Sequence, residues 1–127
     1  MPYPVVAVAV VTSDRGVLLG RRRDGNPPWA LPGGKAEAGE TAADAAVRET
    51  AEETGLTVGA AGEIGRRVHP ATGRLIVYVA AVTAEGSEAR PGDELTEVRW
   101  ASPEEADELT GGTIYEPVRK YLREGSG

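Results

Sequence analysis

The sequence lacks cysteine, long apolar runs and an excess of basic residues, and each absence excludes some classes of function before any motif is considered. There is no cysteine, which excludes disulfides, thiolate metal ligands and cysteine nucleophiles and is typical of a cytoplasmic protein. No apolar run approaches the roughly 18 residues of a membrane-spanning helix, so we expect no membrane partner. The net charge of −6 disfavours binding to a nucleic-acid polymer. A small phosphorylated ligand stays compatible with this charge, because a divalent cation can reverse the local field.

The 127 residues have the composition of one globular domain, with 40% hydrophobic and 27% charged residues. We expect this domain to cover residues 1–123 and the last residues, 124–127, to form a frayed tail. Strands and helices interleave, which predicts an α/β or α+β sandwich with a mixed central sheet. The expected strands are 3–11, 17–22, 74–83 and 97–101, with a glycine-interrupted strand over 56–68; the expected helices are 42–54, 102–109 and 113–122.

The segment from Gly34 to Leu56, GKAEAGETAADAAVRETAEETGL, is unusually rich in acidic residues. Thr41 is a suitable N-cap and Gly55 a suitable C-terminal stop, so the helix is expected to run from 42 to 54. At about 100° per residue, small residues and threonines gather on one face that suits packing against a sheet. Three glutamates share a different face of the helix: Glu49, Glu52 and Glu53.

This acidic face opposes the local rules of helix stability. Glu49 and Glu53 are like charges at i, i+4, which repel, and both lie in the half of the helix where its dipole disfavours negative charge. Arg48 can neutralise and orient part of the cluster. Mg²⁺ or Mn²⁺ would remove the repulsion, because these hard cations bind oxygen ligands. On these grounds alone, a metal site and a solvated acidic face are equal alternatives.

The spacing of the charged residues resembles the Nudix box, whose pattern is G-x5-E-x7-R-E-U-x-E-E-x-G-U, with U a bulky aliphatic residue. Its one departure here is Thr50, which stands at an aliphatic position on the packing face and therefore affects fit rather than chemistry. The box covers 23 of the 127 residues, and the order of strands around it resembles the family over nearly the whole chain. The fixed residues are all present: Gly34, Glu40, Arg48, Glu49, Glu52, Glu53 and Gly55.

This resemblance implies a Mg²⁺-dependent hydrolase (with Mn²⁺ as a substitute) of nucleoside diphosphate derivatives. It implies that the metal ligands are Glu49, Glu52 and Glu53, with the Gly33 carbonyl as a backbone ligand and Glu40 in a further metal or water contact. Arg48 would orient these glutamates. A bound metal lowers the pKa of a water and positions it for attack on phosphorus, and a carboxylate takes the proton.

The resemblance leaves the general base and the substrate contacts open among a few residues. The base is a glutamate of the box, Glu53 or Glu49, or one of the later loop, Glu94 or Glu97. Arg22, at the end of the second strand, is expected to bind phosphate, and Lys35 is a second candidate for that role. Tyr115 stands where related sequences carry a base-reading amide; an aromatic ring can stack on a base but cannot copy the amide's paired donor and acceptor.

We therefore expect a nucleotide pyrophosphohydrolase similar to the small MutT-like members, converting a nucleoside triphosphate, (d)NTP, to (d)NMP and pyrophosphate. An ADP-ribose or nucleotide-sugar pyrophosphatase is the enzymatic alternative. A catalytically inactive module that binds nucleotides as a sensor is the non-enzymatic one, and the intact box argues against it. The resemblance also suggests a homodimer, since family members are often dimers. The base preference, the number of metals and the oligomeric state are left open.

Overall fold

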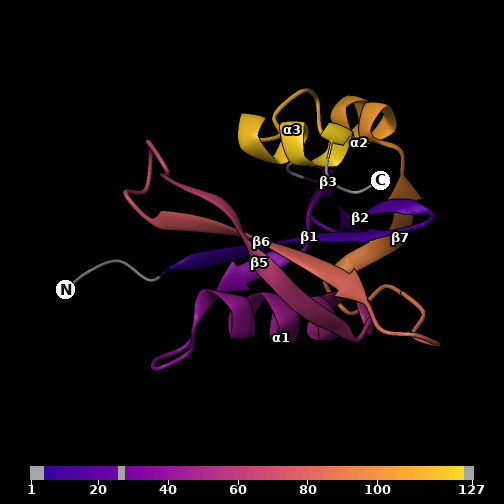
Figure 1. Cartoon of the computed structure of the whole chain (residues 1–127), viewed down its shortest axis with the longest axis horizontal. Coiled ribbons are helices and arrows are strands. Elements are labelled where there is room, and N and C mark those ends of the chain that lie inside the picture. Colours follow the sequence, from indigo (N-terminus) through magenta and orange to yellow (C-terminus); the bar gives the residue numbers. More distant parts are fainter. Residues whose placement is uncertain (1–4, 26–27, 125–127) are drawn as a thin grey trace.

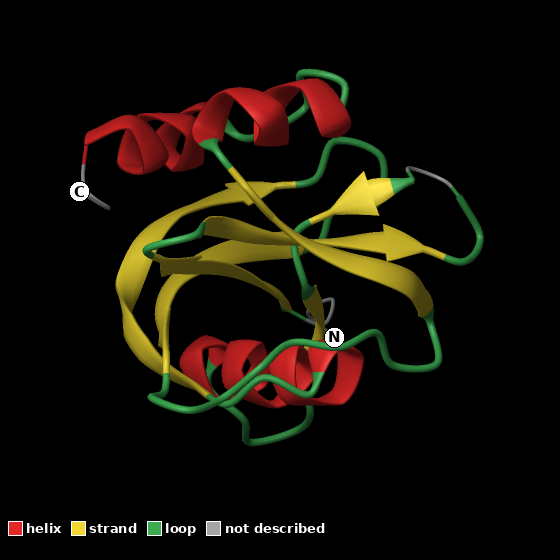
Figure 2. Ribbon diagram, turned by 90° about the vertical axis from the view of Figure 1, so that its right-hand side faces the viewer, coloured by secondary structure: helices red, strands yellow, loops and turns green. Residues whose placement is uncertain are grey.

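The computed structural model of the chain describes residues 5–25 and 28–124. A seven-stranded sheet lies between helix α1 on one face and helices α2 and α3 on the other (Figures 1 and 2). The strands are β1 (Val6–Ser13), β2 (Gly16–Arg22), β3 (Trp29–Ala30), β4 (Gly33–Lys35), β5 (Val58–Val68), β6 (Leu75–Thr83) and β7 (Leu95–Ala101); the helices are α1 (Ala42–Thr54), α2 (Pro103–Leu109) and α3 (Glu116–Glu124).

The central sheet is mixed, as predicted. Its main path runs β3-β2-β1-β6-β5, while β4 pairs with β1 and β7 pairs with β2. The pair β1–β6 is parallel and the other pairs are antiparallel. Because β4 pairs with β1, the glycine segment before α1 lies beside a strand whose alanines and valines belong to the core. No helix within residues 5–25 and 28–124 has the length and apolar character needed to span a membrane.

Most boundaries follow the sequence-based expectations, and the exceptions have local causes. Strand β1 runs on to Ser13, because Ser13 pairs with Gly16 in a tight hairpin; the expected start at residues 3 and 4 lies outside the described part. Strand β7 begins at Leu95 rather than Glu97, since Leu95 pairs with Arg22 across a bulge. Helix α3 begins only at Glu116 and extends to Glu124, one residue into the expected tail.

Helix α1 has the predicted bounds and the predicted caps. The Thr41 hydroxyl accepts a hydrogen bond from the Asp44 N–H at 3.0 Å, and Gly55 ends the helix in the left-handed conformation with a φ of 69°. Thr50 is fully buried, and its hydroxyl donates to the Ala46 carbonyl at 2.7 Å. The departure from the Nudix pattern therefore leaves no unpaired polar group in the core.

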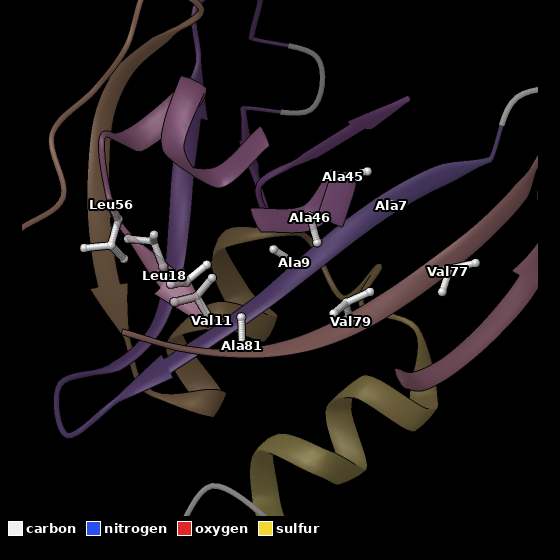
Figure 3. Close-up of a cluster of buried hydrophobic side chains, with 11 residues drawn as sticks. Ala7, Ala9, Val11, Leu18, Ala45, Ala46, Leu56, Val77, Val79 and Ala81 are labelled. Carbon is white, nitrogen blue, oxygen red and sulfur yellow. The ribbon is translucent and has the colours of Figure 1, made fainter. Parts of the chain in front are cut away.

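Small residues bring α1 close to the sheet. Ala45 and Ala46 of the helix are buried against Ala7 and Ala9 of β1, together with valines of β6 and Leu56 (Figure 3). A second cluster fills the space between the sheet and helices α2 and α3. These alanine contacts fix the distance between α1 and the sheet, and with it the position of the helix backbone that carries the box glutamates.

Candidate active site

Arg48 of α1 is the centre of an ionic network at the surface of the helix. Its Nε donates to Glu40 Oε2 at 2.8 Å and its Nη1 to Glu49 Oε1 at 2.8 Å, with Glu52 Oε1 at 3.2 Å from the same nitrogen. Its Nη2 donates to Glu40 Oε1 at 2.9 Å and to the Lys35 carbonyl at 3.1 Å. Arg48 thus neutralises and orients three box glutamates, and it also ties the helix to strand β4.

Glu40 is the carboxylate that Arg48 stabilises most. The guanidinium contacts both of its oxygens, and the Glu37 backbone N–H donates to Oε1 at 2.8 Å. The hydrogen bonds from Arg48, and then the one from Glu37, lower the pKa of Glu40 to about 2. This residue therefore remains ionised at any physiological pH.

Glu53 lies one turn beyond Glu49 and has the opposite electrostatic environment. Burial, a hydrogen bond with the Glu49 carboxyl and the Glu49 and Glu94 charges raise the pKa of Glu53 to about 8, against the effect of a hydrogen bond from the Gly33 backbone. No arginine or lysine of the described residues forms an ion pair with it. Negative charge here exceeds what Arg48 neutralises, and a perturbed carboxyl group of this kind is typical of functional sites.

The glycine pair before the helix allows this arrangement by close backbone approach. A Cβ at Gly34 would collide with the Glu49 carboxylate, and one at Gly33 would lie 2.5 Å from the Ala7 carbonyl oxygen. The backbone contact at Gly33 therefore excludes any larger side chain, and a larger residue at Gly34 would displace the Glu49 carboxylate. The first fixed residue of the box is glycine because strand β4 runs directly against the acidic face of α1.

A cavity of about 490 Å³ opens beside Glu53. It brings together Gly33, Glu53, Glu94 and Arg22, four residues that the sequence placed in the site. Glu94 reaches it from the loop before β7, and Arg22 from the end of β2. The lining residues are Gly20, Arg22, Arg23, Asp24, Ala30, Leu31, Gly33, Glu53, Asp93, Glu94 and Leu95.

A second hollow, of about 620 Å³, lies elsewhere in the molecule, between the β1–β2 hairpin and the loop after β6. It is lined by residues 12–15, 82–89 and Trp100, and it contains no residue that the sequence analysis assigned to the site. Its size is therefore no argument for catalysis. The smaller cavity is the candidate active site, because it contains Glu53 and Glu94.

Of the eleven predicted site residues, four line this cavity, and the side chains of four others form the Arg48 network: Glu40, Arg48, Glu49 and Glu52. The side chains of the remaining three lie outside both. Lys35 is exposed on β4, and its carbonyl rather than its side chain contacts the network. Glu97 is exposed on β7, opposite Arg21. Tyr115 packs on the other face of the sheet: its ring stacks on Tyr78 at a centroid distance of 4.8 Å. Its substrate contact stays a prediction, as do those of Lys35 and Arg22.

The structure shows a contact of Arg23 that the sequence could not assign to one of the three consecutive arginines. Arg21, Arg22 and Arg23 are consecutive, and only the pairing of β2 with β7 and the following loop separates their environments. Arg23 contacts the loop that carries Glu94, with its Nε 3.0 Å from the Asp93 carbonyl oxygen. No signal in the sequence marks this contact, which joins residues 70 positions apart.

The donor set suits a hard divalent cation. The carboxylates of Glu49, Glu52 and Glu53 and the Gly33 carbonyl offer only oxygen, which Mg²⁺ and Mn²⁺ prefer. The described residues contain no group of three acidic or imidazole side chains already arranged as a metal cage. The three glutamates are instead engaged by other partners: Arg48 forms ion pairs with Glu49 and Glu52, and the Glu53 carboxyl group is hydrogen-bonded to Glu49. The raised pKa of Glu53 is the observation that fits a cation, since a cation would offset the crowded charge.

Comparison with known proteins agrees with this geometry. The NUDIX domain model matches residues 2–122. A MutT-like protein of Streptomyces ambofaciens is 36% identical over 84% of the chain and 70% of its own length. An ADP-ribose pyrophosphatase of Methanocaldococcus jannaschii is 36% identical over 77% of the chain, which spans only 62% of that relative.

A solved structure shows the same architecture. The NUDIX hydrolase of Nitrosomonas europaea superposes with a TM-score of 0.85 at 25% identity, covering 98% of this chain and 73% of that one. The fold, the box on helix α1 and the sequence match over residues 2–122 agree, and the chain belongs to the NUDIX domain family.

Proposed function

We propose that this protein is a Mg²⁺-dependent hydrolase of the diphosphate linkage in nucleotide derivatives, and that its substrate is a (d)NTP, released as (d)NMP and pyrophosphate. The observation that carries the proposal is the position of Glu53. Its carboxyl group, with a pKa raised to about 8, lies at a cavity that it shares with Glu94 and Arg22. A purely structural or solvent-exposed glutamate would not need to be buried beside the carboxylates of Glu49 and Glu94.

The protein's own residues divide the work of the reaction. Glu49, Glu52 and Glu53, with the Gly33 carbonyl, would hold the cation, and Arg48 fixes Glu49 and Glu52 through hydrogen bonds of 2.8 and 3.2 Å. Glu40 completes this support by holding Arg48 on two sides. The bound cation supplies charge neutralisation at the diphosphate and a water of lowered pKa.

Glu94 is the general base that we favour among the four candidates. It lines the cavity with Glu53, whereas Glu97 is exposed on β7 outside it. Glu49 is engaged by Arg48, and Glu53 would be committed to the cation. A carboxylate that lies at the cavity and is not needed as a ligand is free to accept a proton from the attacking water.

Arg22 is suited to bind phosphate at the rim of the cavity. Its guanidinium forms an ion pair with Asp24 at 2.9 Å, and both side chains are exposed. An exposed ion pair of this kind contributes little to stability, so the arginine can exchange its carboxylate partner for a phosphate at small cost.

The substrate class rests on two supports. Arg22 lines the cavity beside the carboxylates, which suits a phosphorylated substrate. One relative is a MutT-like protein. An ADP-ribose pyrophosphatase among the relatives favours the alternative of ADP-ribose or a nucleotide sugar. The cytoplasmic location and the homodimer suggested by the sequence stay predictions.

The test is hydrolysis of a panel of compounds by the purified protein with Mg²⁺: the nucleoside triphosphates, ADP-ribose and nucleotide sugars. Release of pyrophosphate and monophosphate from a triphosphate, abolished by EDTA, is the expected result. Faster turnover of ADP-ribose than of any triphosphate would overturn the substrate assignment and leave the hydrolase assignment intact. Binding without turnover of any compound would favour the sensor.

A further inference from the structure

We propose that Arg23 is a positioning residue: it fixes the loop of residues 90–95 so that Glu94 stays at the cavity that it shares with Glu53. The inference rests on the proposed function, in which Glu94 accepts the proton. It assigns to Arg23 no contact with substrate. Among the three consecutive arginines after Gly20, Arg23 is the one whose guanidinium holds this loop, whereas the Arg22 guanidinium is bonded to Asp24.

Arg23 binds the loop backbone at three consecutive residues. Its own N–H donates to the Glu94 carbonyl at 2.9 Å, its Nε donates to the Asp93 carbonyl at 3.0 Å, and its Nη2 lies 3.4 Å from the Leu95 carbonyl. Hydrogen bonds from a charged guanidinium to carbonyl oxygens are stronger than neutral ones, and two from one planar group also fix direction. The peptide groups on both sides of Glu94 are thereby held.

The other end of the same loop is fastened to the last turn of α1. The Gly92 N–H donates to the Glu53 carbonyl and the Arg90 N–H to the Thr54 carbonyl, both at 2.7 Å. A Cβ at Gly92 would lie 2.6 Å from the Glu52 carbonyl oxygen, so only glycine permits this approach. The loop is thus fixed on one side by the helix turn that carries Glu52 and Glu53, and on the other by Arg23.

Glu94 lies between these two anchors. Glu94 and Glu53 line the same cavity. A loop fastened to the helix alone, at Arg90 and Gly92, would let Glu94 shift away from this cavity. The bonds from Arg23 oppose that movement, and a shift of about 1 Å in a catalytic group can cost about 10²-fold in rate.

The committed donors of Arg23 argue against a phosphate contact as its main role. Nε and Nη2 already have carbonyl acceptors in the loop, whereas the Arg22 guanidinium is bonded to an exposed carboxylate. A phosphate could reach these two donors only if Arg23 released the loop.

The experiment is a double-mutant cycle on steady-state kinetics with the preferred substrate and Mg²⁺. Arg23→Ala is expected to lower kcat about 10- to 100-fold with KM changed less than about twofold, and Arg23→Lys to recover part of the loss, because one ammonium can still reach one carbonyl. In the Glu94→Gln background, Arg23→Ala is expected to cost less than about twofold, since the group it positions is gone. Arg99→Ala, an exposed arginine on β7 in a 3.9 Å ion pair, is the matched control and should leave kcat and KM unchanged.

Other results would contradict the role of Arg23 or that of Glu94. If Arg23→Ala raises KM and costs the same in both backgrounds, Arg23 binds substrate phosphate and the proposal is wrong. If Glu94→Gln keeps wild-type kcat, Glu94 is not the base and Arg23 has nothing to position, while hydrolysis by the wild type would still support the proposed function. If circular dichroism shows that Arg23→Ala is unfolded, Arg23→Lys replaces it in the cycle. An equal loss of kcat from Arg23→Lys in the wild-type and Glu94→Gln backgrounds would then overturn the proposal.

Discussion

Glu40 and Glu53 belong to the same acidic motif, yet they have opposite environments. The pKa of Glu40 is lowered to about 2 because Arg48 contacts both of its oxygens. That of Glu53 is raised to about 8 because it is buried beside Glu49, and no lysine or arginine within residues 5–25 and 28–124 forms an ion pair with it. The difference teaches that one arginine can neutralise only part of a crowded carboxylate cluster. The part it leaves out is the part that faces the cavity and would benefit from a metal ion.

The largest effect is expected from Glu53→Gln. The amide cannot replace a charged ligand of a cation, so kcat should fall by about 10²-fold or more. The fold should survive, because the amide has the same shape and its N–H can keep the hydrogen bond with the Glu49 carboxyl group. Pyrophosphate release and thermal unfolding measure the two effects. Near wild-type turnover in this variant would mean that Glu53 is not a metal ligand.

Arg48→Ala should have the next largest effect, because it removes the group that distinguishes Glu40 from Glu53. With Glu40, Glu49 and Glu52 left unpaired, the pKa of Glu40 should rise and the ligands should lose their orientation. Loss of such a supporting partner typically costs about 10- to 100-fold in metal affinity or activity. A Mg²⁺ titration of activity checks this, with Arg48→Lys as the conservative control. An unchanged Mg²⁺ requirement would show that the network is only structural.

The two carboxyl groups also predict opposite effects of pH on stability. Glu53 has a raised pKa, so its contribution is complete below the unfolded value of 4.5 and is lost as the pH rises through about 8. Glu40 has a lowered pKa, so its contribution is complete above 4.5 and is lost as the pH falls through about 2.

Thermal unfolding in EDTA should therefore show stability falling between pH 5 and pH 8, and Glu53→Gln should abolish this component of the decline. Mg²⁺ should raise Tm more at pH 8 than at pH 6, because a deprotonated ligand binds it better. An equal rise in Tm with Mg²⁺ at pH 6 and pH 8 would show that Glu53 does not bind the metal.

The smallest effect is expected far from both carboxylates, at Tyr115. Its hydroxyl donates to the Arg66 carbonyl at 3.0 Å, and its ring stacks on Tyr78. Tyr115→Phe keeps the ring and removes one hydrogen bond, so it should cost no more than about 1 kcal/mol in unfolding free energy. Urea unfolding measures this, and kcat should not change. If Tyr115→Phe lowered kcat as much as Arg48→Ala does, the Tyr115 hydroxyl would have a role in the reaction.

Local patterns predicted the parts of the fold that depend on neighbouring residues. Helix α1 has the expected ends, because its capping threonine and terminal glycine act within one turn. The start of α3 was predicted three residues too early, since Thr113 instead bonds back to the Thr110 carbonyl in a turn. For the site, the box glutamates and Glu94 were predicted from spacing and resemblance, and the structure places Glu53 and Glu94 at one cavity.

The sequence by itself determined the acidic face of α1, its caps and its family, because each of these depends on residue types at fixed local spacing. Only the tertiary structure decided which glutamate has a raised pKa, which of three arginines holds the loop of residues 90–95, and where Tyr115 lies. These features depend on contacts between residues far apart in sequence, such as Arg23 with Asp93 and Gly34 with Glu49. Burial and charge proximity arise from such contacts, and they set the pKa values on which the chemistry depends.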